Sequence, residues 1–250
     1  MNTFNTRIII PTRGGENAVL KTIRNIPEEI HDSILLVASE PVLVNVDQIV
    51  LGTGIGIAEK RQFIHQMQID FGEDYFMVDD DVSFGALDES MKQRRAKLDD
   101  FVRFEHLCRE NRDQYGLISS HPRFFSNRPV RFYPGLSKFV YHNVELTKNA
   151  RYDKNDQFED VDFYLQLIES GIGCVKHNSL VDWNDFSDTE HSIESRVDII
   201  RRWAIDYPNA VTIKEEPSLF AGKKKIPYKI RINWSYANKK TFNSIEFEDT

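Results

Sequence analysis

The first eighty residues alternate between short apolar runs and segments with helical periodicity, and this alternation constrains the fold more than any other feature. The expected strands are four buried runs: Arg7–Pro11, Ser33–Ala38, Gln48–Leu51 and Tyr75–Val78. The expected helices are Glu16–Ile26 and Ile57–Ile69, each with apolar residues on one face. Strands that alternate with helices predict an α/β fold with a mostly parallel sheet flanked by helices. Ligands of such sheets bind at the carboxyl ends of the strands.

The second half continues the pattern with expected antiparallel additions. The expected strands are Gly116–Ser120, Val130–Tyr133, Lys138–Asn143 and Ile172–Lys176. The expected helices are Lys97–Arg112, Gln157–Ser170 with Gly171 as its cap, and Ile193–Ala204. We expect a single domain over residues 1–220, with a nucleotide-binding half at about 1–115 and a second half at about 116–220. A basic and aromatic segment, 221–250, follows it.

Charge and cysteine content exclude several classes of protein. The 250 residues carry 32 Lys and Arg against 39 Asp and Glu, a formal net charge of −7, so the surface as a whole does not favour nucleic acid. Two cysteines provide no disulfide framework, and no apolar run approaches the length of a membrane span. We therefore expect a cytoplasmic protein (host cytoplasm if the chain is viral) that does not bind membranes.

Three consecutive aspartates, Asp79, Asp80 and Asp81, directly follow the apolar run Tyr75–Val78. Adjacent carboxylates repel one another unless a cation compensates, and Mg²⁺ and Mn²⁺ prefer oxygen ligands. In an extended segment Asp79 and Asp81 point to the same side. The triplet, between a buried strand and a turn-like VSFG, therefore predicts a divalent metal site, with an acidic turn that caps the strand as the alternative. His177, after another expected strand, is a further candidate ligand, although a single histidine is more often structural.

The stretch GTGIG at residues 52–56 leads into an expected helix that carries Lys60 and Arg61. It does not complete G-x-G-x-x-G, and the chain has no P-loop motif. Backbone amides at a helix start can still face phosphate, and Arg61 can make a two-pronged contact with a diphosphate. A flexible turn and a solvated helix face are the alternatives.

The segment QFEDVDF places Glu159, Asp160 and Asp162 at the start of an expected helix. Carboxylates are favoured there by the helix dipole, so ordinary capping is one interpretation. With Asp156 nearby, four acids lie within seven residues, which also suits a general base that takes a proton from an attacking hydroxyl. The remaining histidines and the cysteines lack zinc-site spacing, and G-x-S-x-G is absent.

Residues 222–240 contain seven Lys or Arg and no acid, with Tyr228, Trp234 and Tyr236 among them. Nucleic acid is one ligand for such a surface, since cations contact phosphate and aromatic rings stack on bases. A solvated basic edge is the alternative. The candidate nucleic-acid contacts are Lys223, Lys224, Lys225, Lys229 and Arg231.

Taken together, IIIPTRG, LLVASE, GIGIAEKRQFI, FMVDDDV and QFEDVDFYLQLIESG resemble glycosyltransferases of the GT-A fold over about residues 7–180. More narrowly, they resemble the phage and eukaryotic TET/JBP-associated glycosyltransferases. That resemblance implies transfer of a sugar from a nucleotide-sugar, UDP-sugar first, to hydroxymethylpyrimidine in double-stranded DNA, with Mn²⁺ or Mg²⁺ as cofactor. It implies a donor site formed by Thr12, Arg13, Glu40, Arg61, Asp79 and Asp80.

The same resemblance implies that Asp79 and Asp81 bind the metal. It also implies that Asp160, with Glu159 beside it, is the base of an inverting transfer. One departure is Ser39-Glu40-Pro41, where many members have an acidic pair. Two alternatives stay open. One is transfer to a saccharide, lipid carrier or protein. The other is a non-catalytic module that binds nucleotide or nucleic acid.

Overall fold

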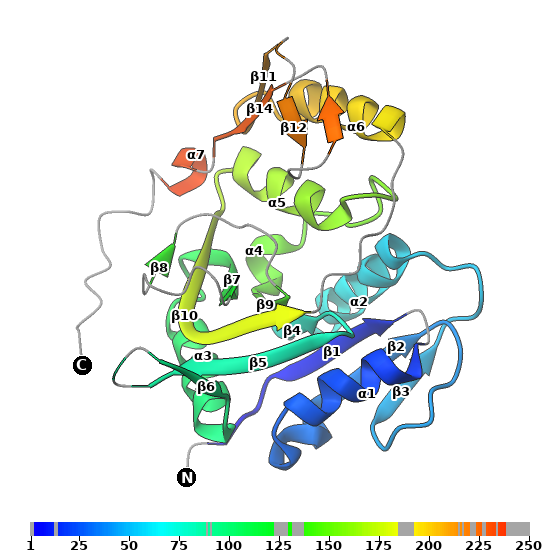
Figure 1. Cartoon of the computed structure of the whole chain (residues 1–250), viewed down its shortest axis with the longest axis vertical. Coiled ribbons are helices and arrows are strands. Elements are labelled where there is room, and N and C mark those ends of the chain that lie inside the picture. Colours follow the sequence, from blue (N-terminus) through cyan, green and yellow to red (C-terminus); the bar gives the residue numbers. More distant parts are fainter. Residues whose placement is uncertain are drawn as a thin grey trace.

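The structure, a computed structural model, describes residues 3–12, 15–88, 90, 92–122, 130–131, 138–184, 193–214, 216, 218–220, 224–226, 229–233 and 235–238. Its centre is a ten-stranded sheet in the order β3-β2-β1-β4-β9-β7-β10-β5-β6, with β8 paired to β10 (Figure 1). No described helix is both long enough and apolar enough to span a bilayer.

The first half of the sheet confirms the expected parallel strands. They are β1 (Arg7–Thr12), β2 (Ile34–Ala38), β3 (Asp47–Val50) and β4 (Tyr75–Val78), with β1 between β2 and β4. The connections contain α1 (Glu16–Asn25), a short 3₁₀ helix (Glu28–Ser33) and α2 (Ile57–Phe71). Gly52 and Gly54, before α2, have φ angles of 100° and 90°, a backbone conformation that favours glycine.

The second half adds mixed strands, as expected, and one expectation there is wrong. Its elements are β5 (Val82–Leu87), β6 (Gln93–Arg95), α3 (Leu98–Glu110), β7 (Tyr115–Pro122), β8 (Val130–Arg131), β9 (Phe139–His142), α4 (Val144–Thr147), α5 (Glu159–Glu169) and β10 (Gly173–Asn184). The turn-like VSFG forms most of strand β5. Its Gly85 is explained by close approach of a neighbour, because a Cβ there would lie 2.7 Å from the Arg94 carbonyl oxygen.

The connection between β4 and β5 shows that the sheet curls. Only Asp79, Asp80 and Asp81 separate the two strands in sequence, yet three strands lie between them in the sheet order. Four flat strand spacings require about 19 Å, whereas four Cα steps reach at most about 15 Å. The irregularity of β10 between Lys176 and Val181 provides the bend, and the residues beyond it pair with β5. The aspartate triplet therefore lies where the sheet folds over.

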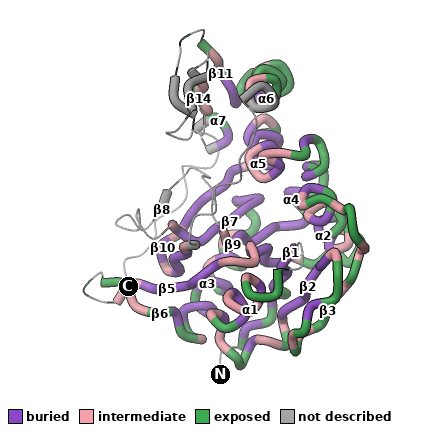
Figure 2. Tube along the Cα trace, turned by 45° about the vertical axis from the view of Figure 1, so that its right-hand side comes forward, coloured by how far each residue is buried: buried purple, intermediate pink, exposed green. Residues whose placement is uncertain are grey.

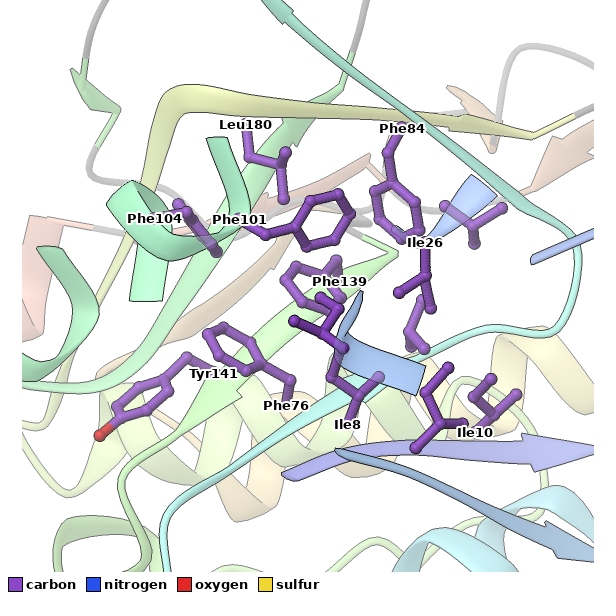
Figure 3. Close-up of a cluster of buried hydrophobic side chains, with 14 of the residues drawn as sticks. Ile8, Ile10, Ile26, Phe76, Phe84, Phe101, Phe104, Phe139, Tyr141 and Leu180 are labelled. Carbon is purple, nitrogen blue, oxygen red and sulfur yellow. The ribbon is translucent and has the colours of Figure 1, made fainter. Parts of the chain in front are cut away.

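Alternating strand residues form two separate apolar cores, one on each face of the sheet. Ile8 and Ile10 belong to the cluster under α1 and α3, which includes Phe76, Phe101 and Phe139 (Figure 3). Ile9 points to the opposite face and belongs to the cluster under α2 and α5. This alternation follows from the strand repeat of two. The sheet edge that carries the candidate site is thus supported from both sides.

The C-terminal elements form a third unit against α5 (Figure 2). They are α6 (Ile193–Asp206), β11 (Val211–Lys214), β12 (Ser218–Phe220), β13 (Lys224–Ile226), β14 (Lys229–Ile232) and α7 (Ser235–Asn238). Strand β11 pairs with β14, and β12 pairs with β13, so strand pairing crosses the expected boundary at residue 220. Ile230 and Ile232 pack with Trp203 and Leu165 in one apolar cluster.

Candidate functional site

The aspartate triplet is held at the carboxyl edge of the parallel strands. Thr12, the last residue of β1, donates its hydroxyl to Asp80 Oδ2 at 2.5 Å. Thr22 of α1 accepts the Val82 N–H at 2.7 Å and donates to the Asp79 carbonyl at 3.3 Å. Burial is the main cause that raises the pKa of Asp80, against the opposing hydrogen bond from Thr12. The two threonines therefore fix the course of the chain through the triplet.

Asp79 binds two cations, one with each carboxylate oxygen. Arg61 Nη2 lies 2.6 Å from Oδ1, and Lys138 Nζ lies 2.6 Å from Oδ2. Burial opposes ionisation of Asp79, but Arg61 and Lys138 hold the pKa of its carboxyl below the usual value. The three side chains come from α2, the end of β4 and the residue before β9, and so they join three separate elements.

Arg61 also joins the sheet edge to α5, because its Nη1 lies 2.7 Å from Glu159 Oε1. Burial by itself would lower the pKa of Arg61, but attraction to Asp79 and Glu159 raises it. Burial raises the pKa of Glu159 despite the charge of Arg61. Glu159 therefore anchors the guanidinium, and this occupied carboxylate is less suited to accept a proton from a substrate.

Asp160 lies beside this pair and is half-buried, with Oδ1 accepting the Val161 N–H at 2.9 Å. Its charge helps to keep both Arg61 and Lys138 protonated, which places it in the same cluster. The turn into α5 has an unusual backbone, since Phe158 has a φ of 57°. A non-glycine residue in that region is uncommon and marks a position under local constraint.

Asp162 has a different environment from the other acids of α5. Its carboxylate is buried and accepts four hydrogen bonds from uncharged donors: Asn155 Nδ2, Gln166 Nε2, Trp203 Nε1 and Tyr207 OH, at 2.7 to 3.0 Å. Burial raises its pKa, and the hydrogen bonds oppose this. Asp162 therefore joins α5 to α6 as part of the structure.

The expected metal set of Asp79, Asp81 and His177 is only partly compatible with these contacts. Both oxygens of Asp79 already accept from cations. His177 lies on β10, where its Nδ1 is 2.9 Å from Ser179 Oγ, and burial lowers its pKa to about 4. The described residues include no group of three His, Cys, Asp or Glu that could hold a metal. One or two carboxylates completed by substrate phosphates remain a suitable magnesium site, and Asp81 has the right chemistry for it.

Other predicted residues have mixed outcomes. Glu40 is exposed, two residues beyond β2, at the same edge as Thr12. Lys60 is buried and donates Nζ to the Ile55 carbonyl at 3.0 Å, so it does not lie on a solvated helix face. Arg13 and Lys223 lie outside the described residues. Lys224 and Lys225 lie on β13, and Lys229 and Arg231 lie on β14, with Arg231 exposed.

The structure adds Lys138 to the cluster, a residue that appears in the sequence analysis only as the start of an expected strand. Its position follows from strand pairing, because the Asp79 N–H donates to the Lys138 carbonyl at 3.1 Å as β4 pairs with β9. The expected strand Lys138–Asn143 was the available signal, but its partner strand was unknown. A separate cavity of about 370 Å³, bounded by the end of α1 and the start of α3, contains none of the predicted site residues.

No family model matches the chain, and no curated protein is similar to it in sequence. Among solved structures, a mycobacterial protein has a TM-score of 0.54 at 10% identity, over 91% of this chain and 83% of that one. A197 from STIV has a TM-score of 0.43 at 12% identity, over 74% and 87% of the two chains. TarS from S. aureus has a TM-score of 0.47 at 13% identity, over 82% of this chain and 40% of its own.

The last two scores are too low to establish a shared fold, whereas the likeness to the mycobacterial protein concerns the fold alone. The observed architecture is a mixed sheet with helices on both faces, and the strands of its first half are parallel. It is consistent with the predicted α/β fold, a mostly parallel mixed sheet flanked by helices.

Proposed function

We propose that this protein is a glycosyltransferase that moves a sugar from a nucleotide-sugar to a hydroxyl group. Among nucleotide-sugars, a UDP-sugar is our first choice of donor. The observation that carries the proposal is the position of Arg61 in a GT-A-like fold. Its guanidinium lies at the carboxyl edge of the parallel strands, held between Asp79 and Glu159. An oriented guanidinium at that edge suits the diphosphate of a nucleotide donor.

The chemistry requires a base and stabilisation of the departing charge. In an inverting transfer the acceptor oxygen bonds to the anomeric carbon as the bond from that carbon to the phosphate oxygen breaks. Asp160 takes the acceptor's hydroxyl proton, and the nucleoside diphosphate leaves with the bonding electron pair. Arg61 stabilises the charge on that leaving group. Glu159 keeps Arg61 in place.

A divalent cation fits this proposal at Asp81, with Asp80 adjacent. The observation that favours it is charge: Asp79, Glu159 and Asp160 already outnumber Arg61 and Lys138 in one cluster. A diphosphate adds further negative charge, and a bound Mn²⁺ or Mg²⁺ would neutralise part of it. Neither Asp79 nor His177 is needed for that role.

For the acceptor, our first choice is hydroxymethylpyrimidine in double-stranded DNA. The basic strands β13 and β14 support this choice, because β14 packs through Ile230 and Ile232 on the unit that contacts α5. Helix α5 begins with Glu159 and Asp160, so the proposed base and strand β14, which carries Lys229 and the exposed Arg231, belong to neighbouring elements. A saccharide, lipid-carrier or protein acceptor uses the same donor chemistry.

The first experiment is thermal unfolding with a panel of nucleotide-sugars, with and without Mn²⁺. A donor at 100 times its dissociation constant adds about 2.7 kcal/mol of stability, which is easily measured. A shift with one donor directs a transfer assay to hydroxymethylated DNA, with unmodified DNA as control. A folded protein that no donor stabilises would contradict the proposed function and favour a binding module.

A further inference from the structure

Both the backbone and the side chain of Lys138 form hydrogen bonds that fix its position. Its carbonyl accepts the Asp79 N–H at 3.1 Å, and its own N–H donates to Asp182 Oδ2 at 3.3 Å. Asp182 is buried on β10 and also accepts the Ser120 hydroxyl. Lys138 is thus fixed on both sides, at the point where β9 meets the end of β4.

The ammonium group of Lys138 retains hydrogen-bonding capacity for a ligand. An ammonium has three N–H donors, and among the described residues its one acceptor is Asp79 Oδ2. The Lys138 side chain is 27% exposed, against 12% for Arg61, so it is the more accessible cation of the pair. A partly exposed ammonium with donors to spare beside a guanidinium suits an anion with several oxygens.

Asp79 joins the two cations, and this occupies both of its oxygens. A metal ion at Asp79 would share an oxygen that already accepts from Arg61 or Lys138 at 2.6 Å, and the nearby positive charge of these two residues would repel it. Asp80, the next carboxylate along the chain, instead accepts the Thr12 hydroxyl. The arrangement therefore separates two tasks within the triplet.

We propose that Lys138 is a second cationic contact for the donor's diphosphate, and that Asp79 positions Lys138 and Arg61 instead of binding metal. This inference rests on the proposed function, because it assigns residues to the diphosphate of the same donor. Lys138 contacts the phosphate oxygens opposite Arg61, and Asp79 keeps the two cations at a fixed separation.

The test is calorimetric titration of the full chain with UDP, uridine and inorganic pyrophosphate, each in EDTA and in Mn²⁺. The variants are Lys138→Met and Lys138→Arg. The matched control is Lys148→Met, because Lys148 forms an ion pair of the same 2.6 Å length with Glu145 on the surface. We expect Lys138→Met to lower the affinity for UDP and for pyrophosphate by about tenfold or more, and to leave the affinity for uridine unchanged. Lys138→Arg restores most of the affinity.

If Lys138→Met lowered the affinity for UDP and for uridine equally, the inference would be overturned, because that pattern indicates a structural role. Unchanged UDP affinity in a folded variant would also overturn it. If wild-type protein transfers sugar yet shows no Lys138 dependence, this inference fails and the proposed function stands. If pyrophosphate binding depends on Lys138 but no donor is ever used, the anion contact stands and the proposed function fails.

The role of Asp79 has its own test in the same titrations. We expect any gain in UDP affinity from Mn²⁺ to persist in Asp79→Asn and to be lost in Asp81→Asn. Loss of the Mn²⁺ effect in Asp79→Asn, with the EDTA affinity unchanged, would show that Asp79 is a metal ligand.

Discussion

Glu159 and Asp162 lie three residues apart on the same helix, and the protein holds their carboxylates in opposite ways. Glu159 faces the sheet edge and forms an ion pair with Arg61, which also binds Asp79. Asp162 faces α6 and accepts only uncharged donors, among them Trp203 and Tyr207. The first arrangement leaves charges near an edge where a ligand can reach them, whereas the second removes a carboxylate from any ligand.

The different environments of Glu159 and Asp162 indicate that the acidic residues around α5 have different roles. The ionic cluster keeps charge available, and the network around Asp162 stabilises the fold. A buried carboxylate with four donors has no capacity left for chemistry. The predictions below test whether this division of tasks is correct.

The largest effect is expected for Asp162→Ala. It leaves four buried donors without their acceptor, and we expect a loss of about 3 to 5 kcal/mol in the free energy of unfolding. Urea denaturation measures it. Asp162→Asn, which keeps one oxygen acceptor, should cost clearly less. A loss below 1 kcal/mol in Asp162→Ala would show that the network is not structural.

Asp160→Asn tests the ionic cluster around Arg61, in which Asp160 is the proposed base. We expect sugar transfer to fall by roughly 100-fold or more, with donor affinity and stability retained, because only the base is removed. Single-turnover transfer and calorimetry measure the two quantities. Asp70→Asn, an exposed acid on α2, is the control. Near-normal transfer in Asp160→Asn would remove Asp160 from the role of base.

His65 provides a third case, a buried imidazole whose hydrogen-bond partners are uncharged. It is buried and lies 3.0 Å from Tyr75 OH and 3.1 Å from the Thr147 carbonyl, and burial lowers its pKa to about 4. The unfolded histidine binds its proton near pH 6.5, so the unfolded state takes up more protons between about pH 6.5 and 4. The stability contributed by neutral His65 is therefore complete above about pH 6.5 and decreases as pH falls.

The expected decrease due to His65 is about 1.6 kcal/mol between pH 6.5 and pH 5. Urea denaturation across this range, compared between wild type and His65→Gln, isolates the contribution. The variant should show a flatter dependence on pH. His106→Gln, an exposed histidine, should retain the slope of the wild type. Identical slopes in wild type and His65→Gln would mean that the buried imidazole is protonated in the folded state.

The smallest expected effects on stability come from substituting the two carboxylates that pair with Arg61, which are Asp79 and Glu159. Asp79 has a lowered pKa, so Asp79→Asn removes a favoured charge and should cost about 1 to 2 kcal/mol. Glu159 has a raised pKa because of burial, so Glu159→Gln should change stability by less than about 0.5 kcal/mol. Thermal and urea unfolding compare the two. The reverse order would mean that Glu159, and not Asp79, is the main anchor of Arg61.

Local patterns in the sequence were sufficient for the first half of the fold. The apolar runs and helical spacing predicted β1 to β4, α1 and α2 nearly to the residue, and the position of Thr12 and the aspartates at one edge followed from parallel pairing. VSFG failed because Gly85 signals a turn locally, whereas its role is to admit the backbone of Arg94. That contact depends on a neighbouring strand.

The site was predictable in residue type but not in partnership. Asp79, Arg61 and Glu159 were all identified, yet the sequence could not show that Arg61 joins the other two. Position within FEDVD alone did not distinguish Glu159, Asp160 and Asp162, and only the family resemblance gave Asp160 and Glu159 a role. Their environments depend on Arg61 and Trp203, which are distant along the chain. Lys138 was missed for the same reason.

The curl of the sheet has a consequence for folding kinetics. Strand β5 begins at Val82, and its partner at the end of β10 is Asn184, so their pairing closes a loop of about one hundred residues. Closing a long loop costs conformational entropy before the contacts compensate, so such pairings form slowly. The turn that carries Asp79, Asp80 and Asp81 joins β5 directly to β4. We therefore expect the ion pairs of Asp79 to reach their final geometry late in folding, after the four parallel strands have assembled.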